Sequence, residues 1–584
     1  MGKYKQQSFL HGATILVAAT LLVKVIGAIY RIPLGNMIGT VGMRYFSNAY
    51  DLYLPIYSLA MAGLPTAVAR IIAQRMSQQR YRDVRRTFKV TKLTFLVTGL
   101  SSFLIMLIAT WPFVSLINST ESVYAILAIS PSILFCCIMS SYRGYYEGQR
   151  NMTPTAVSNI IEALGKLVIG LGLTFVVIQV GMSQFESTGK VFGKVIEGET
   201  PEIMRQAASD AILPYAAAAA VLGITIGSLI GAIYMFVMHK VKGDSFSVRD
   251  LRNSPPPISA KSTLKVLLVM AIPIAIGSLS TQISSLVDTL VVQTRLDGLF
   301  DNHAEEMNAI YSELLSGVTE KSSAIYGTYK GFVYTLYNLI PTIASVIGVS
   351  ALPAVTTAWV KRDRKNLKIN IESVLRITAL VAFPAGIGIS VLSKGIIDLL
   401  YSSREPYMII IATPLLRVMG ITAIISSMCL PITSVLQAIG KQFIPVRNML
   451  IGAGTKGLIS FILVGIPSIN INGAPYGTLV CYLVIFVLNF ISVCRYTHFV
   501  PSIMSIFIKP FICAALCGVT AGAMNWILGG HISENLSTVI SIALAGIVYI
   551  IALFIFKAIS KDDVMMIPKG EKIANVLEKY HLIG

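Results

Sequence analysis

Apolar runs of about 20 residues follow one another along nearly the whole chain, separated by short polar stretches. A run of that length can cross the hydrocarbon core of a bilayer as one α-helix. Of the 584 residues, 54% are hydrophobic and only 13% are charged, whereas soluble proteins carry about 25% charged residues. The sequence therefore predicts an all-α integral membrane protein.

About 14 spans meet this length criterion. They lie near 11–30, 46–73, 89–111, 122–141, 156–178, 210–238, 264–295, 326–358, 371–393, 407–438, 445–465, 474–494, 503–529 and 536–557. We predict two six-helix bundles followed by a C-terminal helix pair. The predicted divisions are a first bundle at 1–240, a linker at 241–262, a second bundle at 263–500, the helix pair at 501–560 and a tail at 561–584.

The net charge of +19 has two interpretations. One is an acidic partner such as nucleic acid. The other is the positive-inside rule, and the location of the charge favours it: Lys and Arg concentrate in alternate loops, for example at 75–92, 240–265 and 361–368. We therefore expect both termini in the cytoplasm and no nucleic-acid partner. The first apolar run ends without a small-residue cleavage site, so we expect a retained helix.

Two pairs of similar segments indicate an internal repeat. GLPTAVAR at 63–70 resembles SALPAVTTA at 350–358, and the stretch 147–173 resembles 438–463, where Lys166 matches Lys456. Because the members of each pair are six helices apart, the halves share one orientation, which predicts a parallel pseudo-twofold repeat. Each Leu-Pro either permits a bend in its helix or marks the end of that helix.

The predicted outer loop between the seventh and eighth spans contains one further helical pattern. At 303–318 the apolar residues recur at helical spacing: Met307, Ile310, Tyr311, Leu314 and Val318. We predict a short amphipathic helix there, and an irregular surface loop is the alternative.

Ionisable side chains inside the predicted spans are candidates for a functional site, because a charge at bilayer depth is costly unless it is paired or faces water. The candidates are Lys24, Arg31, Asp51, Glu162, Lys166, Asp288, Arg295, Lys330, Arg417 and Lys456. Lys24 and Arg31 are seven residues apart and so share a helix face. Long side chains near a membrane boundary also reach water, which is the alternative for Arg31, Arg295 and Lys330. A structural role is the alternative for Lys166 and Lys456, and Arg70 and Arg376 are expected to be cytoplasmic anchors.

Three stretches resemble one known family. LLVKVIGAIYRIPLGNMIG, then YDLYLPIYSLAMAGLPTAVAR with its basic loop, then YRGYYEGQRNMTPTAVSNIIE, occur in the order found in the polysaccharide-flippase branch of the MATE-like (MOP) exporter superfamily, which includes SpoVB-like and MurJ-like proteins. The resemblance implies two six-helix bundles around a central cavity and alternating access. It also implies transport of undecaprenyl-pyrophosphate-linked sugar to the outer leaflet of a bacterial plasma membrane.

The resemblance gives the candidate residues their expected roles. A pyrophosphate needs cationic partners, so Lys24, Arg31, Arg295 and Lys330 are the predicted substrate-binding residues. Asp51 and Asp288 are the predicted cavity or coupling acids, and the other candidates, Glu162, Lys166, Arg417 and Lys456, are secondary. Some MurJ-like proteins carry further cavity arginines in the second and eighth helices. In the predicted membrane part of these helices we find only Arg70, near the inner end of the second, which weakens the case for lipid II itself.

Other functional classes fit the sequence less well. It has six His, with no metal-ligand spacing such as HExxH and no phosphate-binding Gly-rich loop, so we expect no enzyme activity, no metal and no cofactor. Coupling to the membrane potential, H⁺ or Na⁺ stays open. The main alternative is a MATE-type antiporter of drugs or organic cations, since one fold serves several functions. We expect a monomer.

Overall fold

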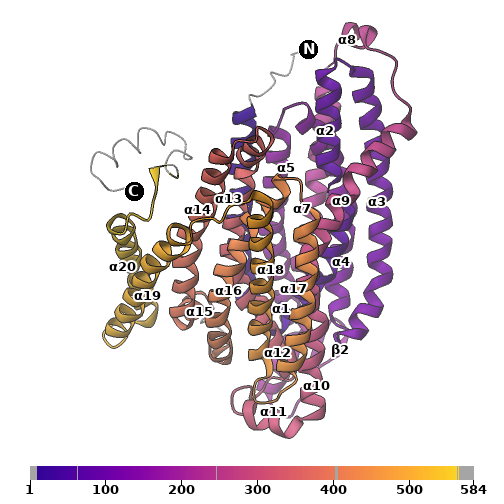
Figure 1. The fold of residues 1–584 in the computed structure, drawn as a ribbon. Helices are drawn as coiled ribbons and strands as arrows, with labels where there is room; N and C mark the ends of the chain where they lie inside the picture. Colours follow the sequence, from indigo (N-terminus) through magenta and orange to yellow (C-terminus); the bar gives the residue numbers. More distant parts are fainter. Residues whose placement is uncertain (1–8, 62, 245, 402–404, 562, 564–584) are drawn as a thin grey trace. The chain divides into compact units, whose positions relative to one another are not determined.

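The computed structural model describes residues 9–61, 63–244, 246–401, 405–561 and 563 (Figure 1). It is almost entirely helical, which confirms the predicted class. Twelve of the described helical segments are long and apolar enough to cross a membrane, so the chain is a multi-pass membrane protein. The predicted number of 14 is not confirmed. One segment, Ala18–Ser77, takes in both the first and the second predicted spans, and the helix Phe443–Val464, near the predicted span 445–465, is not among the twelve.

The described chain divides into two compact units, and each is described by itself. The first comprises the residues up to Thr294 together with Gly317–Gly327. Its elements, with η marking a π- or 3₁₀-helix, are α1 (Phe9–Met61), α2 (Leu64–Ser77), α3 (Tyr81–Leu116), α4 (Ser122–Gly148), α5 (Thr153–Gly165), η1 (Lys166–Gly170), α6 (Leu171–Thr188), the antiparallel strands β1 (Lys190–Val191) and β2 (Lys194–Val195), α7 (Pro201–Lys242), α8 (Val248–Asn253), α9 (Ala260–Val287), η2 (Asp288–Gln293) and α12 (Lys321–Gly327).

The second unit comprises Arg295–Ser316 and the residues from Thr328 onward. Its elements are α10 (Thr294–Asn302), whose first residue belongs to the first unit, α11 (Ala304–Tyr311), η3 (Thr328–Val333), α13 (Tyr334–Val360), α14 (Arg364–Val391), α15 (Ser393–Tyr401), α16 (Pro406–Ala438), α17 (Phe443–Val464), η4 (Asn470–Asn472), α18 (Gly473–Thr497), η5 (Met504–Ile508), α19 (Lys509–Leu528) and α20 (Glu534–Ile555).

The predicted linker at 241–262 lies inside the first unit, because it is fastened to α3. The backbone N–H of Ile258 donates to the buried Asp83 carboxylate at 2.6 Å, and Arg82 Nε donates to the Leu251 carbonyl at 2.7 Å. The next helix, α9, also packs on α1, α2 and α3. The first compact unit therefore extends through the linker to Thr294, and the predicted domain bounds stay a prediction.

A glycine-rich crossing joins α7 to α5 and η1. Gly223 and Gly227 of α7 are four residues apart and face Gly170 and Gly165 respectively. A Cβ atom on Gly165 would lie 2.5 Å from Gly227 Cα, and one on Gly227 would lie 2.8 Å from the Glu162 carbonyl oxygen. Small residues at this spacing let helix backbones approach closely in membranes.

The two Leu-Pro pairs differ in structure. Gly63, with φ of 82°, separates α1 from α2, and Pro65 lies in the first turn of α2. A side chain on Gly63 would also meet the Ala271 carbonyl of α9 at 2.6 Å. The first pair thus follows a break between two helices. Around the second pair the backbone of α13 is helical as far as Val360, although the Pro353 side chain lies outside the described residues.

The predicted amphipathic helix at 303–318 is shorter than expected. It is α11, which ends at Tyr311 and is followed by turns. Met307 and Tyr311 are buried but Ile310 is exposed, and Leu315 is buried in place of the predicted Leu314. The Tyr311 hydroxyl donates to Asn470 Oδ1 at 2.8 Å. Burial raises the pKa of Tyr311 to about 12, so this hydroxyl stays a donor at neutral pH.

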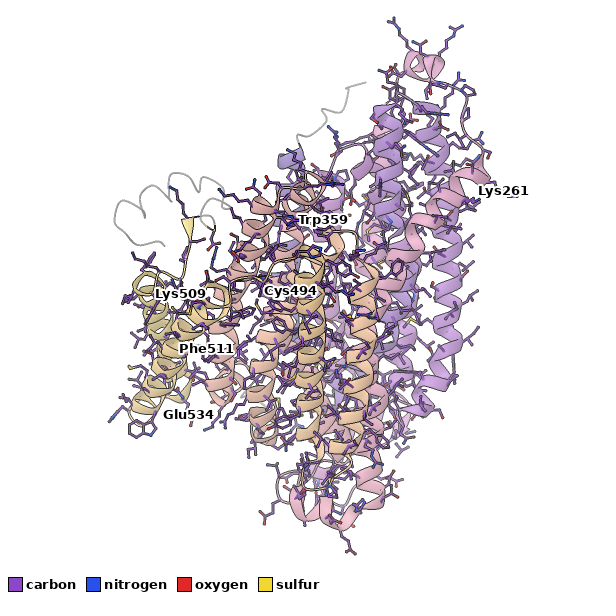
Figure 2. The ribbon with its side chains drawn as sticks, viewed as in Figure 1. Lys261, Trp359, Cys494, Lys509, Phe511 and Glu534 are labelled. Atoms are coloured by element: carbon purple, nitrogen blue, oxygen red, sulfur yellow. The ribbon has the colours of Figure 1, made fainter. Side chains whose placement is uncertain are left out.

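The terminal helices α19 and α20 pack against each other, and their first residues, Lys509 and Glu534, lie at opposite ends of the pair (Figure 2). Arg376 of α14 was predicted to be an anchor, and the structure shows it buried in an ion pair. It donates to Asp563 with Nε at 2.6 Å and Nη2 at 2.9 Å, and its Nη1 donates to Ser505 Oγ at 2.7 Å. This bidentate pair holds the chain just beyond α20 against α14.

Candidate functional site

Two of the predicted cations, Arg31 and Lys166, meet aromatic rings in the first unit. Lys166 Nζ donates to the Tyr50 hydroxyl at 2.9 Å and lies 4.7 Å from the centre of the Tyr30 ring. The Arg31 guanidinium lies 5.8 Å from the centre of the same Tyr50 ring. Lys24 is exposed on α1, seven residues before Arg31 on the same helix face. We call Lys24, Tyr30, Arg31, Tyr50 and Lys166 the cation–aromatic cluster.

Local structure explains why these residues meet. Gly39 has φ of 61° and ψ of −168°, which interrupts the helix within α1 and lets the second part turn back on the first. The rings of Tyr30 and Phe46, from the two parts, then lie 6.2 Å apart. Tyr30 also donates to the Ala220 carbonyl of α7 at 3.0 Å. Lys24 and Arg31 both precede the interruption, so the seven-residue spacing keeps them on one helix face.

The predicted acids Asp51 and Asp288 are both buried in the first unit. Asp51 accepts hydrogen bonds from Ser285 Oγ at 2.7 Å and Thr289 Oγ1 at 2.6 Å. The Tyr326 hydroxyl of α12 donates to Thr289 at 3.2 Å. Asp51 therefore links α1 to α9, η2 and α12 through hydroxyl groups.

Glu162 forms an ion pair that the sequence analysis did not predict. Arg143 of α4 donates from Nη2 to Glu162 at 3.1 Å and from Nε to Ser158 Oγ at 2.9 Å. Arg143 also lines a polar cavity of about 570 Å³ in this unit. The sequence does contain a feature that could have identified Arg143 as a candidate, because this residue lies in the stretch YRGYYEGQ on which the family resemblance rests.

The remaining predicted residues lie in the second unit. The Arg295 guanidinium is 4.4 Å from the centre of the Phe461 ring, and Arg295 Nε donates to the Phe461 carbonyl at 3.3 Å. Lys330 is buried with Nζ 4.7 Å from the centre of the Tyr334 ring. Lys456 is fully buried in α17, whereas Arg417 of α16 is exposed. The four predicted substrate-binding residues thus divide equally between the two units.

Three candidate charges occupy π-helical turns. Lys166 begins η1, Asp288 begins η2 and Lys330 lies within η3. An extra residue in a helical turn is uncommon and is often found at functional sites. This coincidence favours a functional role for these residues, including Lys166, for which a structural role was the alternative.

Arg44 corrects the expectation about arginines in the second helix, where the sequence analysis found only Arg70. The second helix was predicted to begin at residue 46, but helical structure resumes directly after Gly39 and includes Arg44, which is 2% exposed. Arg44 donates to the carbonyl of Ile117 at 3.3 Å and to that of Asn118 at 3.4 Å, and it also bonds Ser323 Oγ. The second helix therefore does contain a buried arginine, which ties α1 to the end of α3 and to α12.

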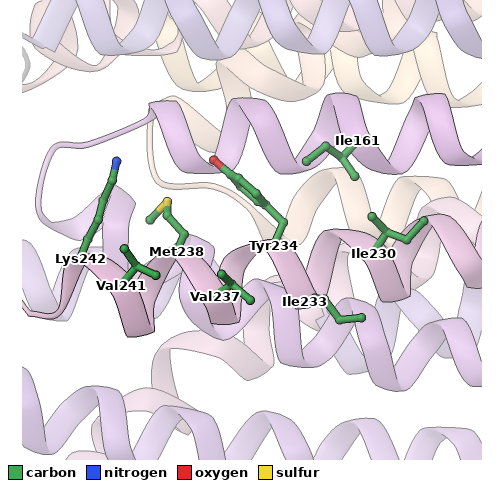
Figure 3. Close-up of a pocket in the computed structure, with 8 residues that line it drawn as sticks. All are labelled: Ile161, Ile230, Ile233, Tyr234, Val237, Met238, Val241 and Lys242. Carbon is green, nitrogen blue, oxygen red and sulfur yellow. The ribbon is translucent and has the colours of Figure 1, made fainter.

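A second cavity, of about 520 Å³, has different chemistry. Ile161 of α5 faces a row of side chains on α7 that includes Ile230, Val237 and Lys242 (Figure 3). Apart from Tyr234 and Lys242 its lining is apolar. This groove has few groups that could recognise a polar headgroup, so it is not part of the candidate site.

Comparisons with known proteins identify the fold and the similar sequences. Residues 9–185 match the family model described as polysaccharide biosynthesis protein, and residues 328–462 match the MatE model. A solved structure titled lipid II flippase MurJ, inward closed conformation, aligns with a TM-score of 0.57 at 14% identity over 93% of this chain and 98% of its own. The fold is that of the MATE-like exporters.

Two bacterial relatives match this chain over almost its whole length. Stage V sporulation protein B of Bacillus subtilis (strain 168) is 22% identical, over 96% of this chain and 98% of its own. Lipid II flippase MurJ of the same organism is 24% identical, over 93% of this chain and 94% of its own. The predicted resemblance to the polysaccharide-flippase branch is therefore confirmed.

Proposed function

We propose that this chain is an alternating-access flippase that moves an undecaprenyl-pyrophosphate-linked saccharide from the inner to the outer leaflet of the plasma membrane. The relatives named as a lipid II flippase and a sporulation protein support this class of function. The observation that carries the proposal is the cation–aromatic cluster, because Arg31 and Lys166 lie against the same Tyr50 ring and Lys24 shares a helix face with Arg31. A pyrophosphate accepts hydrogen bonds from several such cations at once.

The division of roles follows from the chemistry of the groups. Lys24 and Arg31 bind the pyrophosphate, with Lys166 held beside them by Tyr50. In the second unit, Arg295 and Lys330 are the proposed cations that bind the same pyrophosphate later in the transport cycle. The buried acids Asp51 and Asp288 are the proposed groups for a coupling ion, H⁺ or Na⁺, and the membrane potential is the other source of energy.

Reconstitution tests the function directly. Proteoliposomes that contain the full chain should move a labelled undecaprenyl-pyrophosphate saccharide between leaflets, and they should not accumulate an organic cation. The physical reason is that clustered cations attract a polyanion and repel a cation. Uptake of the organic cation without lipid flipping would instead support the MATE-type antiporter, to which the MatE match at 328–462 also points.

The topology gives a separate prediction. Single cysteines introduced at positions 85, 255 and 364 should react only from the cytoplasm, and those at 195 and 310 only from outside, because Lys and Arg concentrate in alternate loops. The measurement is labelling of intact cells with a membrane-impermeant maleimide. Labelling at 255 from outside would contradict the proposed orientation with both termini in the cytoplasm.

A further inference from the structure

The polar cavity of about 570 Å³ in the first unit has no role in the function proposed so far. Its size falls within the roughly 300–1,000 Å³ of small-molecule sites. Side chains with hydroxyl or amide groups dominate its lining, and they come from α1, α2, α4, α5 and α9: Thr20, Tyr57, Ser58, Thr66, Ser140, Thr155, Asn159, Ser278 and Gln282. Such groups donate and accept hydrogen bonds without carrying charge.

The charged residues described in the lining are Arg143 and Glu147, one of each sign. Arg143 pairs with Glu162 at 3.1 Å, and Glu147 accepts a hydrogen bond from Thr155 Oγ1 at 3.0 Å. The Arg143 charge is therefore largely balanced within the protein. The cavity lacks the excess of positive charge that a polyanion requires, in contrast to the cation–aromatic cluster.

A neutral ligand with many hydroxyl groups matches this lining. Each sugar hydroxyl both donates and accepts, as do the Ser, Thr, Asn and Gln side chains around the cavity. The lining also includes Tyr57, whose ring stacks on Tyr53 with centroids 5.2 Å apart. Its amphipathic ring offers an apolar face beside a polar tip, which suits the mixed surface of a sugar.

The cavity also lies next to the proposed pyrophosphate site. Thr20 lines the cavity, and Lys24 follows it by four residues on the same α-helix. Residues four apart lie on one face, separated by about 6 Å along the helix axis. A pyrophosphate is bonded directly to the first sugar of such a lipid, so phosphate bound at Lys24 would place that sugar beside Thr20.

We infer that this cavity binds the sugar nearest the pyrophosphate, so that the first unit recognises both parts of the headgroup. The inference rests on the proposed flippase function. It assigns the choice among lipid-linked substrates to Asn159, Gln282 and their neighbours, and the affinity for pyrophosphate to the cation–aromatic cluster.

Measuring the affinity of the chain for two lipids distinguishes recognition of the sugar from recognition of the pyrophosphate. The full chain in nanodiscs is titrated with undecaprenyl pyrophosphate and with the same lipid carrying an N-acetylated sugar. Asn159→Ala and Gln282→Ala should each weaken binding of the sugar-bearing lipid about tenfold, as expected for a lost polar contact to a ligand, and leave binding of the bare lipid unchanged. Lys24→Ala should weaken binding of both lipids.

Gln179→Ala is the matched control, because Gln179 is exposed on α6 and is not among the residues that line the cavity. It should bind both lipids like the unmodified chain. If the cavity variants bind the sugar-bearing lipid normally, or lose both lipids equally, the sugar site is wrong while the flippase proposal stands. If the unmodified chain binds neither lipid, the flippase proposal itself fails and this inference fails with it.

Discussion

Lys24→Glu is expected to abolish flipping of a pyrophosphate-linked lipid while the protein still inserts in the membrane. Lys24 lies on the same face of α1 as Arg31, and Arg31 and Lys166 lie against the same Tyr50 ring. Clustered like charges are unfavourable without an anionic ligand, and a pyrophosphate supplies the missing negative charge. A carboxylate at position 24 would repel that ligand, and because residue 24 is exposed on α1 the fold should tolerate it.

A series at this position distinguishes charge from geometry. Lys24→Ala should lose most flipping, and Lys24→Arg should retain part of it, since the charge is kept and only the hydrogen-bonding geometry changes. Lys194→Glu is the matched control, because Lys194 is exposed in the short hairpin. Flipping is measured with a labelled lipid in proteoliposomes, normalised to the amount of inserted protein. Normal flipping by a well-inserted Lys24→Glu variant would remove Lys24 from the site.

The helices were largely predictable, because each buries an apolar run that is visible in the sequence. The errors arose where a single backbone position decides the structure. Gly39 lets helix resume well before residue 46, and Gly63 places Pro65 at a helix start. The amphipathic pattern at 303–318 continues beyond Tyr311, but the helix does not. Hydrophobic periodicity records the buried face of a segment and carries little information on where its helix ends.

The candidate site was predictable as a set of residue types and not as an arrangement. Intramembrane charge identified Lys24, Arg31 and Lys166, since burying a charge is costly wherever it occurs. Their common neighbour Tyr50 could not be predicted, because it is 116 residues from Lys166 and carries no charge. Arg143 was missed because it lies just beyond the predicted span 122–141, where an arginine resembles an ordinary anchor.

Gly165→Ala is expected to lower both thermal stability and flipping, although alanine is the better helix former by about 1 kcal/mol. The new methyl carbon would lie 2.5 Å from Gly227 Cα, so α5 and α7 would have to separate. Such overpacking costs about 1–3 kcal/mol. Since Lys166 follows directly, the shift should also disturb its hydrogen bond to Tyr50.

Gly172→Ala is the matched control for this crossing. Gly172 lies in α6, seven residues further along the chain, and a Cβ atom there would have no neighbour within 4 Å. This variant should be as stable as the unmodified protein or slightly more so, since only helix propensity changes. Thermal unfolding in detergent and flipping per inserted molecule measure the two effects. Equal unfolding temperatures for the two variants would mean that α7 does not approach α5 as closely as the structure places it, and Lys166 would then lose the support that orients it toward the substrate.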